Sequence, residues 1–173
     1  FIGSHLGNYT LMCSCFAELI QSFFCHIIDN CIRLTCFSRD RPHRTILTAI
    51  KNKELRDKLS AMNAEIMGRP GIDPFYGAPE LLVVLADKAV PTYLYDGSLV
   101  MGNLMNAASD LGVGSCWIHR AKEEFESEEG KKILKSLGIE GDYEGIGHCV
   151  LGYAAEPAKP PVPRKENYVY CVL

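Results

Sequence analysis

The chain has 173 residues, of which 47% are hydrophobic and 23% are charged, and its formal net charge is −3. This length suits one domain, and this composition is typical of a globular protein and excludes a mainly disordered chain. The slightly acidic balance provides no basic surface for nucleic acid, and no apolar run reaches the ~18 residues of a membrane span. We therefore expect a single globular domain with neither nucleic acid nor membrane as a partner.

Composition changes near residue 50. Residues 1–38 are rich in Cys, Phe, Ile and Leu, and the apolar stretch 19–28 has no period that would identify it as helix or strand. Residues 45–50 are expected to form a short strand. Residues 54–67 predict an amphipathic helix, whose apolar stripe consists of Leu55, Leu59, Met62 and Ile66.

The middle of the chain alternates between strand and helix signals. Residues 72–79 predict a loop with aromatic side chains, and the aliphatic run 81–86 predicts a strand that is covered on both faces. A strand is also expected at residues 115–118. Between these strands, residues 96–111 predict a helix, whose inner face we assign to Leu99, Leu104, Ala108 and Leu111.

The last third of the chain adds a helix, a strand and an extended arm. Residues 123–137 predict one charged surface helix, and we interpret its acidic run, residues 123–129, as a solvated face. Residues 145–153 predict a buried strand. Four prolines between residues 157 and 163 predict a stiff arm, and residues 168–173 have strand composition. Because that final strand needs a sheet to join, a partner subunit is its natural host. The whole pattern predicts an α/β or α+β layered domain.

The eight cysteines are unevenly distributed, and five of them lie in the first 36 residues. A chain this rich in aliphatic residues needs no disulfide scaffold. Cys13 and Cys15, with Cys25 and His26 further on, leave a zinc site open as a distant alternative, but the chain has no Cys-x-x-Cys pair. We favour buried or incidental thiols, no bound metal and a reducing, cytoplasmic location.

Two polar pairs are candidate ligand contacts. His119 and Arg120 directly follow the strand expected at residues 115–118, and polar residues at strand ends often contact ligands in layered sheets. A capped surface turn is an equally good interpretation of this pair. Arg164 and Lys165 could bind a phosphate through charge-assisted hydrogen bonds, although composition alone favours an ordinary solvated pair.

Several segments of the chain together resemble the FMN-dependent nitroreductase family. The most specific is Leu-Gly-Val-Gly-Ser-Cys-Trp-Ile-His-Arg at residues 111–120. The other matching segments are residues 74–79 (Pro-Phe-Tyr-Gly-Ala-Pro), 82–87, 96–98, 139–143, 147–153 (Gly-His-Cys-Val-Leu-Gly-Tyr) and 163–165 (Pro-Arg-Lys). The resemblance covers about residues 50–173 and places the chain near the small, single-domain nitroreductases.

The resemblance implies a nitroreductase-like α+β fold, with a central mixed or antiparallel sheet flanked by helices. It also implies a homodimer with FMN at the subunit interface, in which the arm formed by residues 154–173 wraps the other subunit. A backbone N–H near His119 would face flavin N5, and Arg164 with Lys165 would reach the FMN phosphate. The implied cofactor-binding residues are Gly114, Ser115, Cys116, Trp117, Ile118, His119, Arg120, Arg164 and Lys165.

The activity implied by the resemblance is that of an FMN-dependent oxidoreductase. Hydride would pass from NAD(P)H through FMN N5 to a nitroaromatic, quinone or similar acceptor, by a ping-pong mechanism in which both substrates use one pocket. Pro79 and the aromatic loop before it would form the substrate-side wall of that pocket.

The N-terminal third departs from the family pattern. An Arg-Arg-Ser-x-Arg element and a Pro-Ser/Thr-x-x-Asn-x-Gln-Pro loop are expected there, and neither occurs in residues 1–50. We hypothesise a reading-frame error in this segment, since the family pattern resumes abruptly at Lys51. The departure favours one alternative function, a family member without redox turnover that serves as a flavin-binding or flavin-free scaffold.

Overall fold

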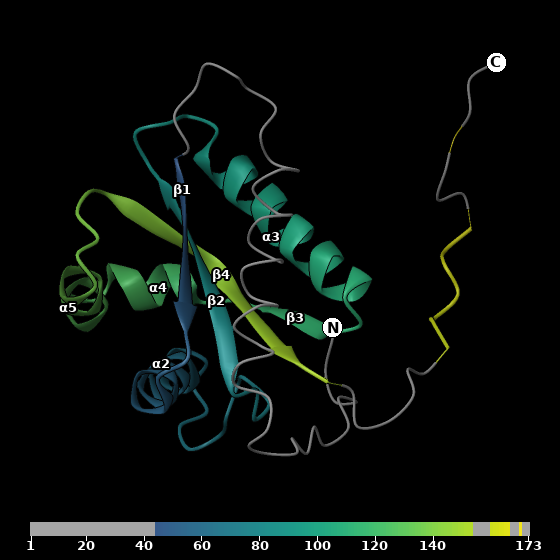
Figure 1. Ribbon diagram of the computed structural model, residues 1–173, viewed down its shortest axis with the longest axis horizontal. Helices are drawn as coiled ribbons and strands as arrows, with labels where there is room; N and C mark the ends of the chain where they lie inside the picture. Colours follow the sequence, from purple (N-terminus) through teal and green to yellow (C-terminus); the bar gives the residue numbers. More distant parts are fainter. Residues whose placement is uncertain (1–43, 154–159, 167–169, 171–173) are drawn as a thin grey trace.

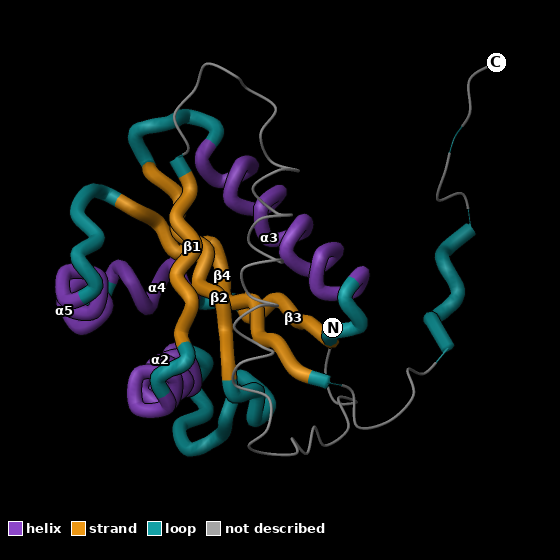
Figure 2. Tube along the Cα trace, viewed as in Figure 1, coloured by secondary structure: helices purple, strands orange, loops and turns teal. Residues whose placement is uncertain are grey.

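The computed structural model describes residues 44–153, 160–166 and 170. These residues contain one four-stranded sheet in the order β1-β2-β4-β3. Its strands are β1 (Thr45–Ile50), β2 (Glu80–Asp87), β3 (Gly114–Ile118) and β4 (Tyr143–Gly152). Every neighbouring pair is antiparallel, and β1 and β3 are the edges (Figure 2). The strands expected at residues 45–50, 81–86, 115–118 and 145–153 and the α+β class are confirmed.

Helices cover both faces of this sheet (Figure 1). Among the described residues, the helix α3 (Tyr93–Asp110) is the one helix that covers the first face. The other face carries α2 (Lys53–Ile66), α4 (Ala121–Glu126) and α5 (Glu128–Ser136). The described domain is therefore a three-layer structure, with the sheet in the middle.

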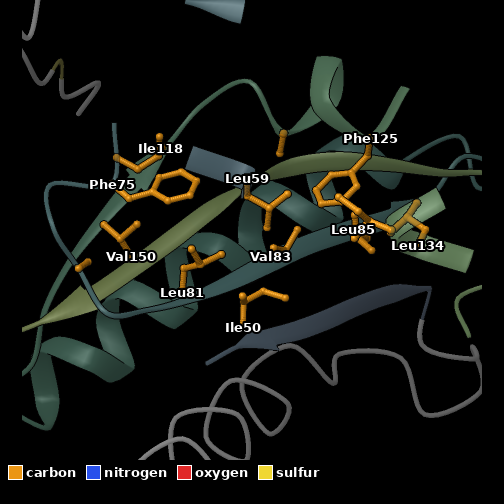
Figure 3. Packing of buried hydrophobic residues seen from close by; sticks show 13 residues of the cluster. Ile50, Leu59, Phe75, Leu81, Val83, Leu85, Ile118, Phe125, Leu134 and Val150 are labelled. Carbon is orange, nitrogen blue, oxygen red and sulfur yellow. The ribbon is translucent and has the colours of Figure 1, made fainter. Parts of the chain in front are cut away.

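The central strand β2 is buried on both faces, as its aliphatic run predicts. Its side chains alternate between two hydrophobic clusters. Leu82, Val84 and Ala86 pack in the α3 layer. Leu81, Val83 and Leu85 pack in the α2–α4 layer, where Phe125 and Leu134 from the helices lie against them (Figure 3).

A bulge in β4 changes which of its side chains face each layer. Consecutive residues of β2 pair with Gly147 and Gly145, so Ile146 is an extra residue in β4. Ile146 packs in the α3 layer, whereas His148, two residues later, lies against aromatic rings of the α2–α4 layer. The bulge therefore places an imidazole inside the core of the α2–α4 layer.

The helix α2 packs most of its predicted stripe against the core, but it also buries polar side chains. Asn52 caps its N-terminus by accepting a hydrogen bond from the Leu55 N–H at 2.9 Å. Leu59 is buried and Leu55 and Met62 pack against the same cluster, as expected, but Ile66 is 41% exposed. The buried positions include three polar ones, Arg56, Ser60 and Asn63. The prediction of an apolar stripe through Ile66 is wrong because these polar side chains find hydrogen-bond partners inside the fold.

The helix α3 buries Leu104 and Ala108 as predicted, but not Leu99. Leu99, which we expected on its inner face, is 58% exposed. At Gly97 the helix approaches the sheet so closely that a Cβ would overlap the Ile146 side chain. This contact fixes the helix rotation that leaves Leu99 outside. The buried face is formed by Gly97, Val100, Met101, Leu104, Ala107 and Ala108.

Residues 123–137 form parts of two helices rather than the single helix predicted. Ser127 separates α4 from α5, since its backbone is extended and its Oγ accepts a hydrogen bond from the Gly130 N–H at 3.0 Å. The same hydroxyl donates to the Glu124 carbonyl at 2.6 Å. Glu124, which we expected on a solvated face, is fully buried. That expectation is wrong because Glu124 shares one face of α4 with Ala121 and Phe125, both of which pack in the core.

Several predictions concern residues outside the described ranges. They are the apolar stretch 19–28, the strand at 168–173 except for Tyr170, and the cysteines Cys13, Cys15 and Cys25. Among the described residues, no helix is long and apolar enough to cross a membrane. In the same ranges no three His, Cys, Asp or Glu side chains are grouped so as to hold a metal ion.

Candidate functional site

The predicted ligand-binding segment lies at one edge of the sheet. Gly114–Ile118 form β3, and His119 and Arg120 follow directly. Within the described residues β3 pairs only with β4. Alternate backbone N–H and C=O groups of such an edge strand face away from the sheet, where they can bind a ligand.

The chain turns sharply where β3 ends. Arg120 has a φ of 77°, in the left-handed region, and it is the N-cap residue of α4. Only one other non-glycine residue of the described ranges, Tyr76, has a positive φ. A side chain in this backbone conformation persists where surrounding contacts hold it. The backbone N–H groups of His119 and Arg120 are therefore presented by a constrained turn.

An aromatic surface lies beside this turn on the α3 side. The indole of Trp117 and the imidazole of His119 stack, with ring centroids 5.6 Å apart and an interplanar angle of 24°. Trp117 lies over Gly147, where a Cβ would overlap the indole. His119 is exposed. Two flat rings beside an edge-strand backbone form a surface that suits a planar ligand.

The inward-facing residues of β3 do not offer a reactive side chain. Cys116 and Ile118 pack in the α2–α4 layer. Burial raises the pKa of the Cys116 thiol, which disfavours the thiolate that a nucleophile would require. Ligand contacts along β3 therefore fall to the backbone, to Ser115 and to the Trp117–His119 pair.

Asn63 of α2 connects three groups on the inner side of the turn. Its Nδ2 donates to the His119 carbonyl at 2.8 Å and also to Glu124 Oε1. Its Oδ1 accepts a hydrogen bond from Arg120 Nε at 2.9 Å. Asn63 is fully buried, so these bonds replace its hydration and tie α2 to the turn after β3.

A buried carboxyl and a buried imidazole lie behind Asn63. Glu124 and His148 are both fully buried, and Glu124 Oε2 lies 3.1 Å from His148 Nε2. The His148 ring packs against Phe75 and Phe125, at centroid distances of 5.0 and 6.2 Å. Because neither polar group reaches the surface, this pair cannot exchange a proton directly with a bound ligand.

The loop before β2 is held by Asp73, which accepts four hydrogen bonds. The donors are the Ser60 hydroxyl at 2.6 Å, the Phe75 N–H at 3.0 Å, the Gly77 N–H at 2.8 Å and the Arg56 guanidinium. Burial opposes ionisation of Asp73, but these hydrogen bonds outweigh it and hold the pKa of the carboxyl below its usual range.

Arg56 fastens the other end of the same loop. Its Nε donates to the Ala78 carbonyl at 2.9 Å, and its guanidinium lies 5.5 Å from the centroid of the Phe75 ring. Phe75 is fully buried, whereas Tyr76 is 44% exposed and Pro79 is exposed as well. The loop is therefore fixed by α2 and presents Tyr76 and Pro79 outward.

The described structure does not bring Arg164 and Lys165 to the end of β3. Both residues are exposed and lie in residues 160–166, an extended segment that stands apart from the sheet and its helices (Figure 1). Within one chain, the two cationic side chains predicted to bind a phosphate are thus separated from the residues at the end of β3 that are predicted to contact the ring of the ligand.

Sequence reasoning missed three buried polar residues near the turn: Asn63, Glu124 and His148. For Glu124 a signal exists, since Ala121, Glu124 and Phe125 have the i, i+3, i+4 spacing of one helix face. For Asn63 the signal is its place four residues after the buried Leu59. For His148 there is no such signal, because the bulge in β4 decides which layer its ring enters.

Comparison with known proteins agrees with this geometry. The family model described as the nitroreductase family matches residues 43–153. A nitroreductase with bound FMN from Desulfitobacterium hafniense is 26% identical, with a TM-score of 0.71 over 93% of this chain and 89% of that chain. A nitroreductase with bound FMN from Bacteroides fragilis is 20% identical, with a TM-score of 0.69 over 84% of this chain and 86% of that chain.

A third similar structure is the nitroreductase CinD from Lactococcus lactis in complex with 4-nitrophenol. It is 15% identical, with a TM-score of 0.63 over 90% of this chain and 99% of that chain. A search of curated proteins finds no match. These likenesses confirm the nitroreductase-like fold expected from the sequence.

Proposed function

Because the chain belongs to the nitroreductase family, we propose that it is an FMN-dependent oxidoreductase. The observation that carries the proposal is the family match over residues 43–153, which includes β3 and the turn that follows it. When bound, FMN would supply a hydride-accepting N5 position for ping-pong exchange between NAD(P)H and a nitroaromatic, quinone or similar acceptor.

The residues at the end of β3 fit the ring system of a flavin. The edge of β3 offers backbone N–H donors to a planar heteroaromatic ring, and the left-handed turn at Arg120 fixes their direction. Fixed backbone donors need no reorganisation when a ligand arrives. We propose that a backbone N–H near His119 faces flavin N5. The contacts proposed along the rest of this edge come from Gly114, Ser115, Cys116, Trp117, Ile118 and Arg120.

We propose that the phosphate end of the cofactor is bound by Arg164 and Lys165 from the other subunit of a homodimer. Two observations support this arrangement. Residues 160–166 stand apart from their own sheet, and the free edge of β3 faces outward within the described structure. Deleting residues 163–173 should therefore weaken the dimer and release FMN together. Sedimentation of the shortened chain as a fully flavinated dimer would contradict this part of the proposal.

The loop held by Asp73 and Arg56 is the proposed wall of the acceptor pocket. It presents Tyr76 and Pro79 outward on a backbone that four hydrogen bonds to one carboxylate hold in place. A rigid wall positions a flat acceptor without a large loss of entropy on binding. We also propose a cytoplasmic location, which the free thiol of Cys116 supports.

The alternative function is a flavin-binding or flavin-free scaffold without redox turnover. The observation that favours it is the absence, in residues 1–50, of the arginine element and the polar loop expected for this family. If our hypothesis of a reading-frame error is right, the intact mass of the native protein will differ from that of this sequence. A matching mass would remove that explanation and strengthen the scaffold alternative.

An absorption spectrum of the purified protein, recorded before and after addition of NADPH, tests the proposed function. We expect flavin bands that bleach with NADPH and return when a quinone is added. A spectrum without flavin, even after incubation with FMN, would favour the flavin-free scaffold. Flavin bands that NADPH and NADH leave unchanged would favour the flavin-binding scaffold.

A further inference from the structure

The unusual backbone of Arg120 needs a physical cause. Its φ of 77° is disfavoured for any residue with a Cβ. It is also the junction at which β3 ends and α4 begins. A conformation of this kind is kept only where neighbouring groups hold it.

Asn63 contacts this junction at two separate points. Its Nδ2 binds the carbonyl of His119, the residue before the junction, at 2.8 Å. Its Oδ1 binds the Nε of Arg120 itself, at 2.9 Å. One fully buried amide therefore holds both the peptide group and the side chain of the left-handed residue.

The contacts around Asn63 determine which way its amide points. The Arg120 guanidinium has only donors, so the acceptor Oδ1 must face it. Both hydrogens of Nδ2 are then used, one by the His119 carbonyl and the other by Glu124 Oε1. Glu124 in turn lies 3.1 Å from the His148 imidazole, and the Phe75 ring packs against that imidazole. Rotation of the amide by half a turn would break all three hydrogen bonds.

The hydrogen bond to the His119 carbonyl also fixes the N–H on the opposite side of the same peptide group. The described residues contain no cis peptide bond, and in a planar trans peptide the C=O and the following N–H point in opposite directions. Because Asn63 holds the His119 carbonyl toward α2, the N–H of Arg120 must point away from α2. The buried amide thus sets the direction of a donor at the candidate site.

We propose that Asn63, Glu124 and His148 are positioning residues that fix the direction of the backbone N–H between His119 and Arg120. The inference rests on the proposed function in one respect: it takes the flavin ring as the group that this N–H faces. Asn63 holds the peptide, Glu124 holds the second N–H of Asn63, and His148 packs beside Glu124. None of the three needs to touch the cofactor.

The decisive variant is Asn63→Leu, which keeps the branched shape of the side chain and removes every hydrogen bond of the amide. We expect the backbone NMR shifts of Arg120, which report on its positive φ, to move toward ordinary values in the protein without added nucleotide. We also expect flavin bleaching by NADPH to slow by about tenfold to a hundredfold. The FMN dissociation constant should change less than the bleaching rate, because the phosphate contacts are elsewhere.

Two further variants separate positioning from general stability. Leu59→Val removes a buried methylene one helical turn earlier in α2, from a side chain that can make no hydrogen bond. It should lower thermal stability while leaving the Arg120 shifts and the bleaching rate unchanged. Glu124→Gln keeps an oxygen for Asn63 Nδ2, so its effect on both readouts should lie between those of the other two variants.

Two outcomes would overturn the inference. One is an Asn63→Leu protein in which the Arg120 shifts equal those of the unaltered protein. The other is a bleaching rate that falls equally in Asn63→Leu and in Leu59→Val. If the unaltered protein binds no flavin, the proposed function fails, but the NMR comparison still decides whether Asn63 positions the peptide.

Discussion

Replacing Asp73 is the strongest test of whether its hydrogen bonds hold the loop before β2 in place. Asp73→Asn removes the charge and one of two acceptor oxygens. Either the two donors to Oδ2, the Arg56 guanidinium and the Gly77 N–H, or the two donors to Oδ1, the Ser60 hydroxyl and the Phe75 N–H, then lose their acceptor. A hydrogen bond to a charged group contributes about 1.5–3 kcal/mol. Water replaces part of this, because the Asp73 side chain is 35% exposed. We therefore expect a total loss of about 2–3 kcal/mol in the free energy of unfolding.

Asp57→Asn is the matched control for this substitution. Asp57 also pairs with Arg56, at 3.1 Å, but its side chain is 45% exposed and it binds no loop backbone. The loss for Asp57→Asn should be much smaller than that for Asp73→Asn, as for an ordinary surface ion pair. Thermal unfolding followed by circular dichroism should lower the Tm of Asp73→Asn by about 4–12 °C. Equal shifts for Asp57→Asn and Asp73→Asn would refute the argument that the loop contacts matter.

The same carboxyl predicts a pH dependence with a definite sign. The pKa of Asp73 is lower in the folded protein than its ordinary value of 3.8, because hydrogen bonds outweigh the opposing effect of burial. Its contribution to stability is therefore complete above about pH 5 and is lost as the pH falls through the folded-state value. The stability difference between the unaltered protein and Asp73→Asn should be constant from about pH 7 to pH 5 and then shrink in acid. A difference that grows below pH 4 would contradict the assigned direction.

Three other substitutions test the sheet and the candidate site. Gly145→Ala should lower the free energy of unfolding in urea titrations more than Gly147→Ala does. The new Cβ at residue 145 meets the backbone at the start of α4, whereas the one at residue 147 meets the movable Trp117 indole. Equal losses of stability would contradict this. His119→Ala should keep most of the rate of flavin bleaching by NADPH, whereas His119→Pro removes the His119 N–H and disturbs the backbone that directs the neighbouring Arg120 N–H, and it should slow bleaching strongly; equal rates would assign the role to the imidazole. Arg164→Ala should raise the FMN dissociation constant about tenfold to a hundredfold while barely changing riboflavin binding, because riboflavin has no phosphate. Equal losses of affinity for the two ligands would indicate that Arg164 packs in the structure instead of pairing with the phosphate.

The sequence by itself determines the parts of this protein that depend on local pattern. The aliphatic run of β2 identifies a strand buried on both faces, because only such a strand tolerates apolar side chains at every position. The two glycines and one proline of residues 68–71 end α2 close to the predicted boundary at residue 67. The segment 111–120 is specific enough to indicate the family, which the family match confirms.

Only the tertiary structure decides which polar side chains turn inward. Glu124 belongs to a run of acidic residues that would be solvated on an isolated helix, but Asn63 on another helix gives it a buried partner. His148 enters the α2–α4 layer because an extra residue in β4 reverses the alternation of its side chains. Such partners are far apart in the chain, since Asn63 and Glu124 are separated by 61 positions. Periodicity describes one element at a time, so it cannot reveal a network that four elements assemble together.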